Sequence, residues 1–198
     1  MRSRTPADLA GRCPGCYLPT ALCLCAEVPR LETRTHFLVI RHSKEASKST
    51  NTARLAGLAL THCRILTYGA PGQPFEPSVL EAPGTWLLFP DAQPPPPGTP
   101  PPERVVVLDG NWAQARRMYH RLPALSRLPG LALPPPPPDA RRLRRSPHPH
   151  AMSTVEAIAA ALSLLEGEHV ARPLHALHEL MIDRVMAARG RLPDDEDD

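Results

Sequence analysis

The chain has few aromatic residues, and it has neither a long apolar run nor an apolar segment near its N-terminus. Phe, Trp and Tyr make up 4% of its 198 residues, so a core must be built from Leu, Val and Ala. No apolar run approaches the length of a membrane span, and the N-terminus lacks the apolar region of an export signal. We therefore expect a cytoplasmic protein without a membrane partner, large enough for one substantial domain.

Proline and charge are distributed unevenly along the chain. Many of the 27 proline residues lie in runs at 94–97, 100–102 and 134–138, which we expect to form stiff connectors. The net charge of +3 includes five acidic residues at 194–198, and arginine is concentrated between 104 and 145. A basic body with an acidic tail indicates a polyanionic partner. The alternative to such a partner, on composition alone, is a charged face that only keeps the protein in solution.

Short apolar, β-branched segments alternate with segments of helical character along most of the chain. Strands are predicted at 36–40, 64–68, 85–89 and 104–108, and helices at 51–60, 112–122, 153–167 and 174–189. The helix that begins near Ser153 opens with a capping box, because Glu156 follows three positions later. The alternation predicts an α/β fold with a mostly parallel sheet and helices on both faces.

The most informative stretch runs from Arg104 to Trp112. A run of β-branched residues ends in Asp-Gly-Asn, which predicts a buried strand, a tight turn and the start of a helix. Ligands sit at the carboxyl edge of such sheets, so Asp109 is the candidate catalytic residue. Asn111 and Gln114 also fit a capping pattern. Capping would explain Asn111, but it does not explain an acidic residue directly after four apolar ones.

Four of the five cysteines lie within thirteen positions, as Cys13-Pro-Gly-Cys16 and Cys23-Leu-Cys25. Two short pairs on tight turns can supply the four sulfur ligands that structural zinc prefers. Thiols stay reduced in the cytoplasm, which favours a metal over disulfides; a redox pair or unrelated core residues are the alternatives. We predict a closed zinc knuckle that folds the N-terminal module, and a separate core thiol at Cys63.

Basic residues gather in two further segments. Arg41, Lys44 and Lys48 follow the first predicted strand and precede a helix, whose N-terminus would attract an anion. In the same segment Glu45 can be an ion-pair partner, and residues 49–51 can be N-caps rather than ligand contacts. The second segment, Arg141-Arg-Leu-Arg-Arg145, suits contacts with a phosphate backbone.

Taken together, these segments resemble the DTW-domain family. The resemblance spans nearly the whole chain: the two cysteine pairs, Arg41-His-x-x-Glu45, Thr50-Asn-Thr52, Leu87-Leu-Phe-Pro90, Leu108-Asp-Gly-Asn-Trp112, Leu143-Arg144 and Met152-Ser-Thr-Val-Glu-Ala157. Two departures are visible. Asn111 stands where the family has Thr, which removes a hydroxyl, and Thr50 stands where the family has Ser.

The resemblance implies a tRNA-uridine aminocarboxypropyltransferase with a knotted, SPOUT-like fold. Such an enzyme transfers the 3-amino-3-carboxypropyl group of S-adenosylmethionine to N3 of a uridine and releases methylthioadenosine. The implied organisation is a cysteine-rich module at 1–30, a catalytic domain at 31–190 and an acidic disordered tail at 191–198. We identify no obligate protein partner.

The resemblance and the motifs together assign residues to three roles. The catalytic candidates are Asp109, Asn111 and Trp112, where Trp112 either stacks the extruded base or anchors its helix. The cofactor-binding candidates are Arg41, Glu45, Leu88, Phe89, Pro90, Leu108, Gly110, Ser153, Thr154 and Glu156. The RNA-binding candidates are Lys44, Lys48, Arg116, Arg117, Arg142, Arg144 and Arg145.

Two other functions fit the same features. A SPOUT-like RNA methyltransferase would use the same cofactor but release S-adenosylhomocysteine. A non-enzymatic, zinc-bearing RNA-binding module would bind tRNA and leave it unmodified.

Overall fold

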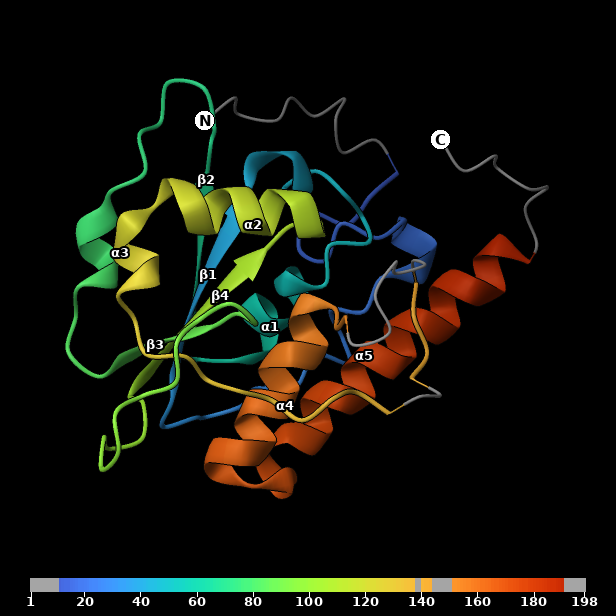
Figure 1. Ribbon diagram of the computed structural model, residues 1–198. Coiled ribbons are helices and arrows are strands. Elements are labelled where there is room, and N and C mark those ends of the chain that lie inside the picture. The colour runs from blue at the N-terminus through green and yellow to red at the C-terminus, as the bar shows by residue number, and fades with distance from the viewer. Residues whose placement is uncertain (1–10, 138–139, 144–150, 191–198) are drawn as a thin grey trace.

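The computed structural model describes residues 11–137, 140–143 and 151–190, and it contains a four-stranded, fully parallel sheet (Figure 1). The strand order is β2-β1-β4-β3. The strands are β1 (His36–His42), β2 (Cys63–Tyr68), β3 (Thr85–Leu88) and β4 (Arg104–Asp109). The mostly parallel α/β fold that the sequence predicts is therefore confirmed.

Five α-helices and three short 3-10 helices accompany the sheet in the described part of the chain. The α-helices are α1 (Ala53–Ala59), α2 (Trp112–Arg121), α3 (Pro123–Ser126), α4 (Thr154–Glu166) and α5 (Glu168–Arg189). The 3-10 helices are η2 (Thr20–Leu22), η3 (Ser43–Glu45) and η4 (Pro77–Leu80). None of the helices in the described ranges is long and apolar enough to cross a bilayer.

Helices cover both faces of the sheet, as the apolar strands require. In β4, Val105 and Val107 face a core built with α1, α4 and α5, whereas Val106 and Leu108 face one built with α2 and α3 (Figure 1). Strands that are apolar on both sides are typical of buried parallel sheets. The two central strands, β1 and β4, are therefore buried along most of their length, and β4 ends at the buried Asp109.

The helix boundaries of the last third confirm one prediction and correct another. Ser153 caps α4 and forms the predicted capping box with Glu156, and Gly167 ends that helix with a φ of 104°. However, α5 begins at Glu168 and not near Leu174, so Pro173 lies inside the helix. A proline this close to the N-terminus removes one backbone hydrogen bond, while the neighbouring Leu174 is fully buried.

The cysteine-bearing module packs against the rest of the protein. Cys16, Leu18 and Leu24 belong to the same apolar cluster as α4 and α5. Arg184 of α5 donates to the carbonyl of Cys23. The predicted division at residue 30 stays a prediction, and residues 1–10 and the predicted tail at 191–198 lie outside the described ranges.

Candidate functional site

The carboxylate of Asp109 lies at the carboxyl end of β4, buried to 4% exposure. Each of its oxygens accepts one hydrogen bond. The side-chain nitrogen of Asn51 donates to Oδ2 over 2.6 Å, and the hydroxyl of Thr154 donates to Oδ1 over 2.6 Å. Asn51 lies in the loop before α1, and Thr154 is the first residue of α4. Two distant segments therefore hold the predicted catalytic carboxylate in one orientation.

Burial dominates the electrostatics of Asp109. The loss of water around the carboxylate raises its pKa above the ordinary value for aspartate, because burial disfavours the charged form. Hydrogen bonds from Thr154 and Asn51 and the positive charge of Arg41 oppose the rise, whereas the nearby Glu45 adds to it. A carboxylate with a raised pKa is a stronger base than an exposed one and is better suited to accept a proton near neutral pH.

Asn51 is a residue of this centre that the sequence analysis leaves without a role. The N-cap interpretation is wrong for this residue, because α1 starts at Ala53 and its N-cap position is Thr52. The amide of Asn51 bonds to Asp109 instead. The signal that could have found it is its position in the Thr-Asn-Thr motif.

Arg41 and Glu45 lie near Asp109 and also make contacts of their own. Arg41 of β1 pairs in register with Asp109, and its guanidinium donates to the hydroxyl of Thr67 over 3.4 Å. Glu45 is 2% exposed and accepts a charged hydrogen bond from Lys48 Nζ over 2.7 Å. The ion-pair interpretation of Glu45 is therefore confirmed. The predicted contacts of Arg41 and Glu45 with a cofactor stay predictions.

Asn111 is the N-cap of α2 and Trp112 is its first residue, two and three positions after Asp109. Asn111 Oδ1 accepts from the backbone nitrogen of Gln114, and the Gln114 side chain accepts from the Asn111 nitrogen, so the predicted capping box is confirmed. Trp112 is 38% exposed and stacks on Phe89, with ring centroids 5.7 Å apart. An exposed, stacked indole suits a platform for a base. Both interpretations of Trp112, as a platform for a base and as an anchor for its helix, stay predictions.

The predicted pocket-lining residues after β3 and at the end of β4 differ in burial. Phe89 and Leu108 are buried in the same apolar cluster, whereas Leu88 packs against the cluster on the other face. Pro90 is exposed and Gly110 is half-buried. At Gly110 an added Cβ would lie 2.9 Å from the side chain of Gln114, so glycine allows the tight turn into α2. Their role in cofactor binding stays a prediction.

A pocket of about 370 Å³ lies beside the N-terminus of α4, and Asp109 is not among its lining residues. Thr154 bonds to Asp109, while Glu156 and Met152 line the pocket with Arg141 of the proline-rich segment and with His175, His178 and Glu179 of α5. Ser153 Oγ lies 3.5 Å from Nε2 of His178. Burial lowers the pKa of His178, which therefore favours the neutral form. The structure thus brings predicted cofactor-binding residues of α4 to both the carboxylate and the pocket.

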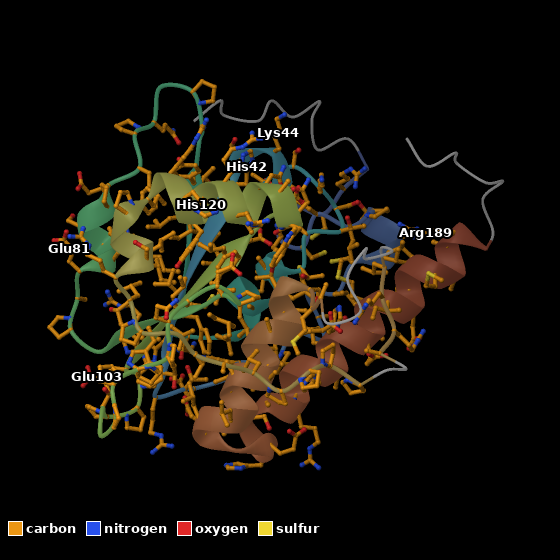
Figure 2. All side chains as sticks on the ribbon, viewed as in Figure 1. His42, Lys44, Glu81, Glu103, His120 and Arg189 are labelled. Carbon is orange, nitrogen blue, oxygen red and sulfur yellow. The ribbon has the colours of Figure 1, made fainter. Side chains whose placement is uncertain are left out.

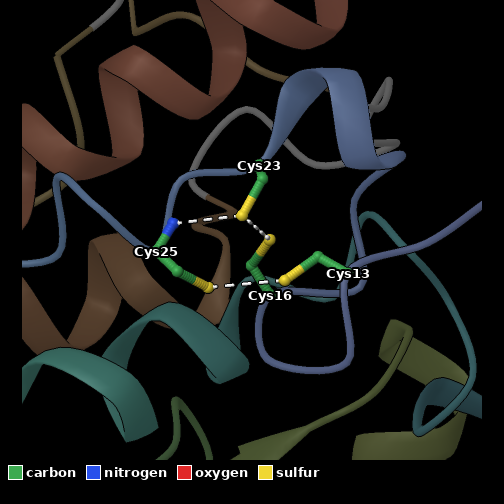
Figure 3. A group of neighbouring side chains, drawn as sticks. All are labelled: Cys13, Cys16, Cys23 and Cys25. Carbon is green, nitrogen blue, oxygen red and sulfur yellow. Dashed lines mark hydrogen bonds between the residues drawn. The ribbon is translucent and has the colours of Figure 1, made fainter.

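The four N-terminal cysteines converge on one point (Figure 3). Their sulfur atoms all lie within 4.8 Å of one another, with 3.6 Å between Cys13 and Cys25 and 3.9 Å between Cys16 and Cys23. Tetrahedral zinc with bonds of about 2.3 Å needs sulfur atoms roughly 3.8 Å apart. The arrangement of the four residues therefore fits a closed structural zinc site, as the spacing predicts.

The pKa values of Cys13 and Cys25 depart from the ordinary value in opposite directions. A hydrogen bond from the backbone of Cys16 lowers the pKa of Cys13 to about 6. The pKa of Cys25 is raised to about 12, because its sulfur loses water on burial and because Cys13 lies next to it. One thiolate forms readily, and its negative charge opposes the next. A divalent cation at the centre would remove this repulsion. In contrast, Cys63 lies apart, and burial raises its pKa to about 12.

Several predicted RNA-binding residues gather near the same end of the sheet. Burial lowers the pKa of His42, and the charges of Lys44, Arg117 and Lys48 lower it further while Glu45 opposes them, so each of these three cations lies within electrostatic range of His42. Figure 2 shows His42 and Lys44 at the end of the molecule where β1 finishes, and Glu103 at the opposite end.

The remaining predicted RNA-binding residues have surroundings of their own. Arg116 is exposed, and its Nε lies 3.9 Å from Asp91. Arg142 is half-buried, and Arg144 and Arg145 lie outside the described residues.

A family model described as the DTW domain matches residues 10–186. The chain belongs to the DTW-domain family. A relative from Drosophila melanogaster, named tRNA-uridine aminocarboxypropyltransferase 2, is 27% identical over 91% of this chain and 79% of its own length. Relatives of the same name from Macaca fascicularis and Mus musculus are 27% and 29% identical over 87% and 86% of this chain.

The DTW chain is shorter than these relatives. It spans 64% of the macaque protein and 63% of the mouse protein, less than two thirds of each. No solved structure shows a significant match to the chain.

Proposed function

We propose that this DTW-domain protein transfers the 3-amino-3-carboxypropyl group of S-adenosylmethionine to N3 of a uridine in tRNA. The observation that carries the proposal is the Asp109 carboxylate, buried at the carboxyl edge of the sheet and held by Asn51 and Thr154. The relatives' shared name supports the substrate and the transferred group.

The reaction needs a base and a positioned donor. Uridine N3 forms a bond to the γ-carbon of the donor and loses its proton. The bond between that carbon and sulfur breaks, and its electron pair stays on sulfur. The sulfonium thereby becomes the neutral thioether methylthioadenosine. Three carbons on the sulfonium are electrophilic, so the outcome depends on which one the site presents to the nucleophile.

In this proposal Asp109 accepts the N3 proton. An imide nitrogen is a weak nucleophile until it is deprotonated, and a base close to the reacting atom lowers the barrier. Burial raises the pKa of Asp109 in the direction that a base requires. Asn51 and Thr154 fix the carboxylate through one hydrogen bond to each oxygen. The second lone pair of each oxygen is then available to substrate.

The N-terminus of α4 is the proposed place of the donor. Thr154 contacts Asp109, and Met152 and Glu156 line the adjoining pocket. The positive end of the α4 dipole and the cation of Arg41 suit the donor's carboxylate. The carboxylates of Glu45 and Glu156 suit its ammonium group.

The tRNA would approach over η3 and α2. Lys44, Lys48 and Arg117 form a basic group near His42, which suits phosphate contacts. Trp112 is exposed at the start of α2, three positions after Asp109, where it would stack the extruded uracil. We further propose that zinc occupies the four-cysteine site, that the sheet belongs to a knotted SPOUT-like fold, and that the enzyme works in the cytoplasm.

The experiment that tests the proposal follows labelled donor atoms into tRNA. Purified protein is incubated with unmodified tRNA and S-adenosylmethionine labelled either in the methyl group or in the methionine backbone. We expect backbone label in one nucleoside and methyl label in released methylthioadenosine, both by mass spectrometry. Methyl label in tRNA with S-adenosylhomocysteine as the product would identify a methyltransferase instead. Bound but unmodified tRNA would identify a binding module.

A further inference from the structure

The carbonyl oxygen of Asn51 is a buried acceptor that the described residues leave without a partner. Asn51 is 4% exposed, and its nitrogen donates to Asp109 over 2.6 Å. Its Oδ1 makes no hydrogen bond within the described ranges. Buried polar atoms in folded proteins nearly always have a partner, so an orphan acceptor beside a candidate base indicates a missing ligand group.

The orientation of the amide follows from its neighbour. An ionised carboxylate only accepts hydrogen bonds, so Asp109 must face the nitrogen of Asn51 rather than the oxygen. Thr154 already supplies the other donor. The Asn51 oxygen is therefore left to a group that donates.

The position of Asn51 is well fixed by its surroundings. It lies between the end of β4 and the N-terminus of α4. The next residue, Thr52, accepts a hydrogen bond from the backbone nitrogen of Val155 over 3.5 Å. One amide group thus connects Asp109 to the buried, unpartnered acceptor, so a donor bound there would be held beside the carboxylate.

We propose that Asn51 Oδ1 accepts a hydrogen bond from an N–H group of the bound substrates, which makes Asn51 a substrate-binding residue of the transferase. The inference rests on the proposed function. Two N–H groups are available, the α-ammonium of S-adenosylmethionine and the imide of uracil. Asp109 takes the imide proton in the proposed reaction, so the ammonium is the expected partner. Asn51 would then hold the electrophile and the base together.

The test measures whether Asn51 recognises the N–H group itself. Dissociation constants are measured by calorimetry for S-adenosylmethionine and for its analogue without the α-amino group, on wild type and on Asn51→Ala. The wild type should prefer the amino compound by roughly tenfold to a hundredfold, as expected for a hydrogen bond to a charged group. Asn51→Ala should bind the two compounds alike.

A second variant and a second ligand pair complete the test. Asn51→Gln keeps both the amide nitrogen that donates to Asp109 and the acceptor oxygen, so it should keep the preference even if Asn51→Ala unfolds. A short RNA with uridine is compared with the same RNA carrying N3-methyluridine. Loss of that preference in Asn51→Ala would assign the oxygen to the imide instead of the ammonium.

The outcomes separate this inference from the proposed function. If the wild type transfers the group but Asn51→Ala keeps both ligand preferences, or Asn51→Gln loses them, the inference alone is overturned. If the wild type neither binds S-adenosylmethionine nor modifies tRNA, the proposed function fails and the inference fails with it.

Discussion

The four-cysteine cluster and the Asp109 centre are built in opposite ways. All four cysteines of the cluster come from one short segment, from Cys13 to Cys25, and their sulfur atoms lie within 4.8 Å of one another. Asp109 takes its two donors from Asn51 and Thr154, which are 58 and 45 positions away. A local cluster can fold around a metal by itself, whereas the carboxylate depends on the whole sheet and on α4. The first should therefore determine stability, and the second should determine activity.

The largest expected effect is on the stability of the cluster. Cys13→Ser should lower the free energy of unfolding by about 5 kcal/mol or more, because binding of structural zinc contributes to folding. Chelation of the metal in wild type should act in the same direction. Chemical denaturation measures both. The matched control is Cys63→Ser, outside the cluster, for which we expect a change of about 1 kcal/mol. Equal midpoints for the two variants would show that the cluster holds no structural metal.

These two regions also differ in how far the sequence predicts them. The cysteine spacing predicts the cluster because ligands within thirteen positions are close in any compact fold. Asp109 is predictable because an acidic residue follows a buried apolar run. The role of Asn51 is not predictable from the sequence, because its contact with Asp109 exists only after β1 and β4 pair. The start of α5 at Glu168 is also not predictable from the sequence, since the burial of Leu174 outweighs the local effect of Pro173.

Removal of one donor to Asp109 should reduce activity more than stability. Thr154→Val keeps the shape of the side chain and removes the hydroxyl that bonds to Oδ1. We expect the transfer rate to fall by roughly tenfold to a hundredfold, equivalent to a lost hydrogen bond to a charged group. Thr154→Ser keeps the hydroxyl and should retain most of the rate. Single-turnover assays compare the two, and equal rates would contradict the positioning role.

The pH dependence should report the buried carboxylate. Because burial raises the pKa of Asp109, the transfer rate should fall as the pH decreases through that pKa, by up to about tenfold per pH unit. The folded state holds this proton more tightly than the unfolded state. The contribution of Asp109 to stability is therefore greatest at low pH and declines as the pH rises through the raised pKa. A transfer rate that stays constant down to the ordinary pKa of aspartate would contradict the assignment.

The smallest expected effect concerns the basic group beside the site. Lys44→Gln and Arg117→Gln should each weaken tRNA binding a few-fold and reduce the slope of log affinity against log salt by about 0.7–0.9. The control is Arg64→Gln, exposed near the start of β2, which should leave the slope unchanged. Fluorescence anisotropy at several salt concentrations measures all three. An equal loss at Arg64 would show that the tRNA binds elsewhere.

The most direct test of the account is Asp109→Asn, measured for transfer rate and for thermal midpoint together. The new amide can accept from Asn51 and donate to the hydroxyl of Thr154, and it removes a charge that burial disfavours. The matched control is Asp91→Asn on an exposed loop. The account predicts that Asp109→Asn loses transfer by at least about a thousandfold at an unchanged or higher midpoint, while Asp91→Asn stays active. An active Asp109→Asn protein would contradict it.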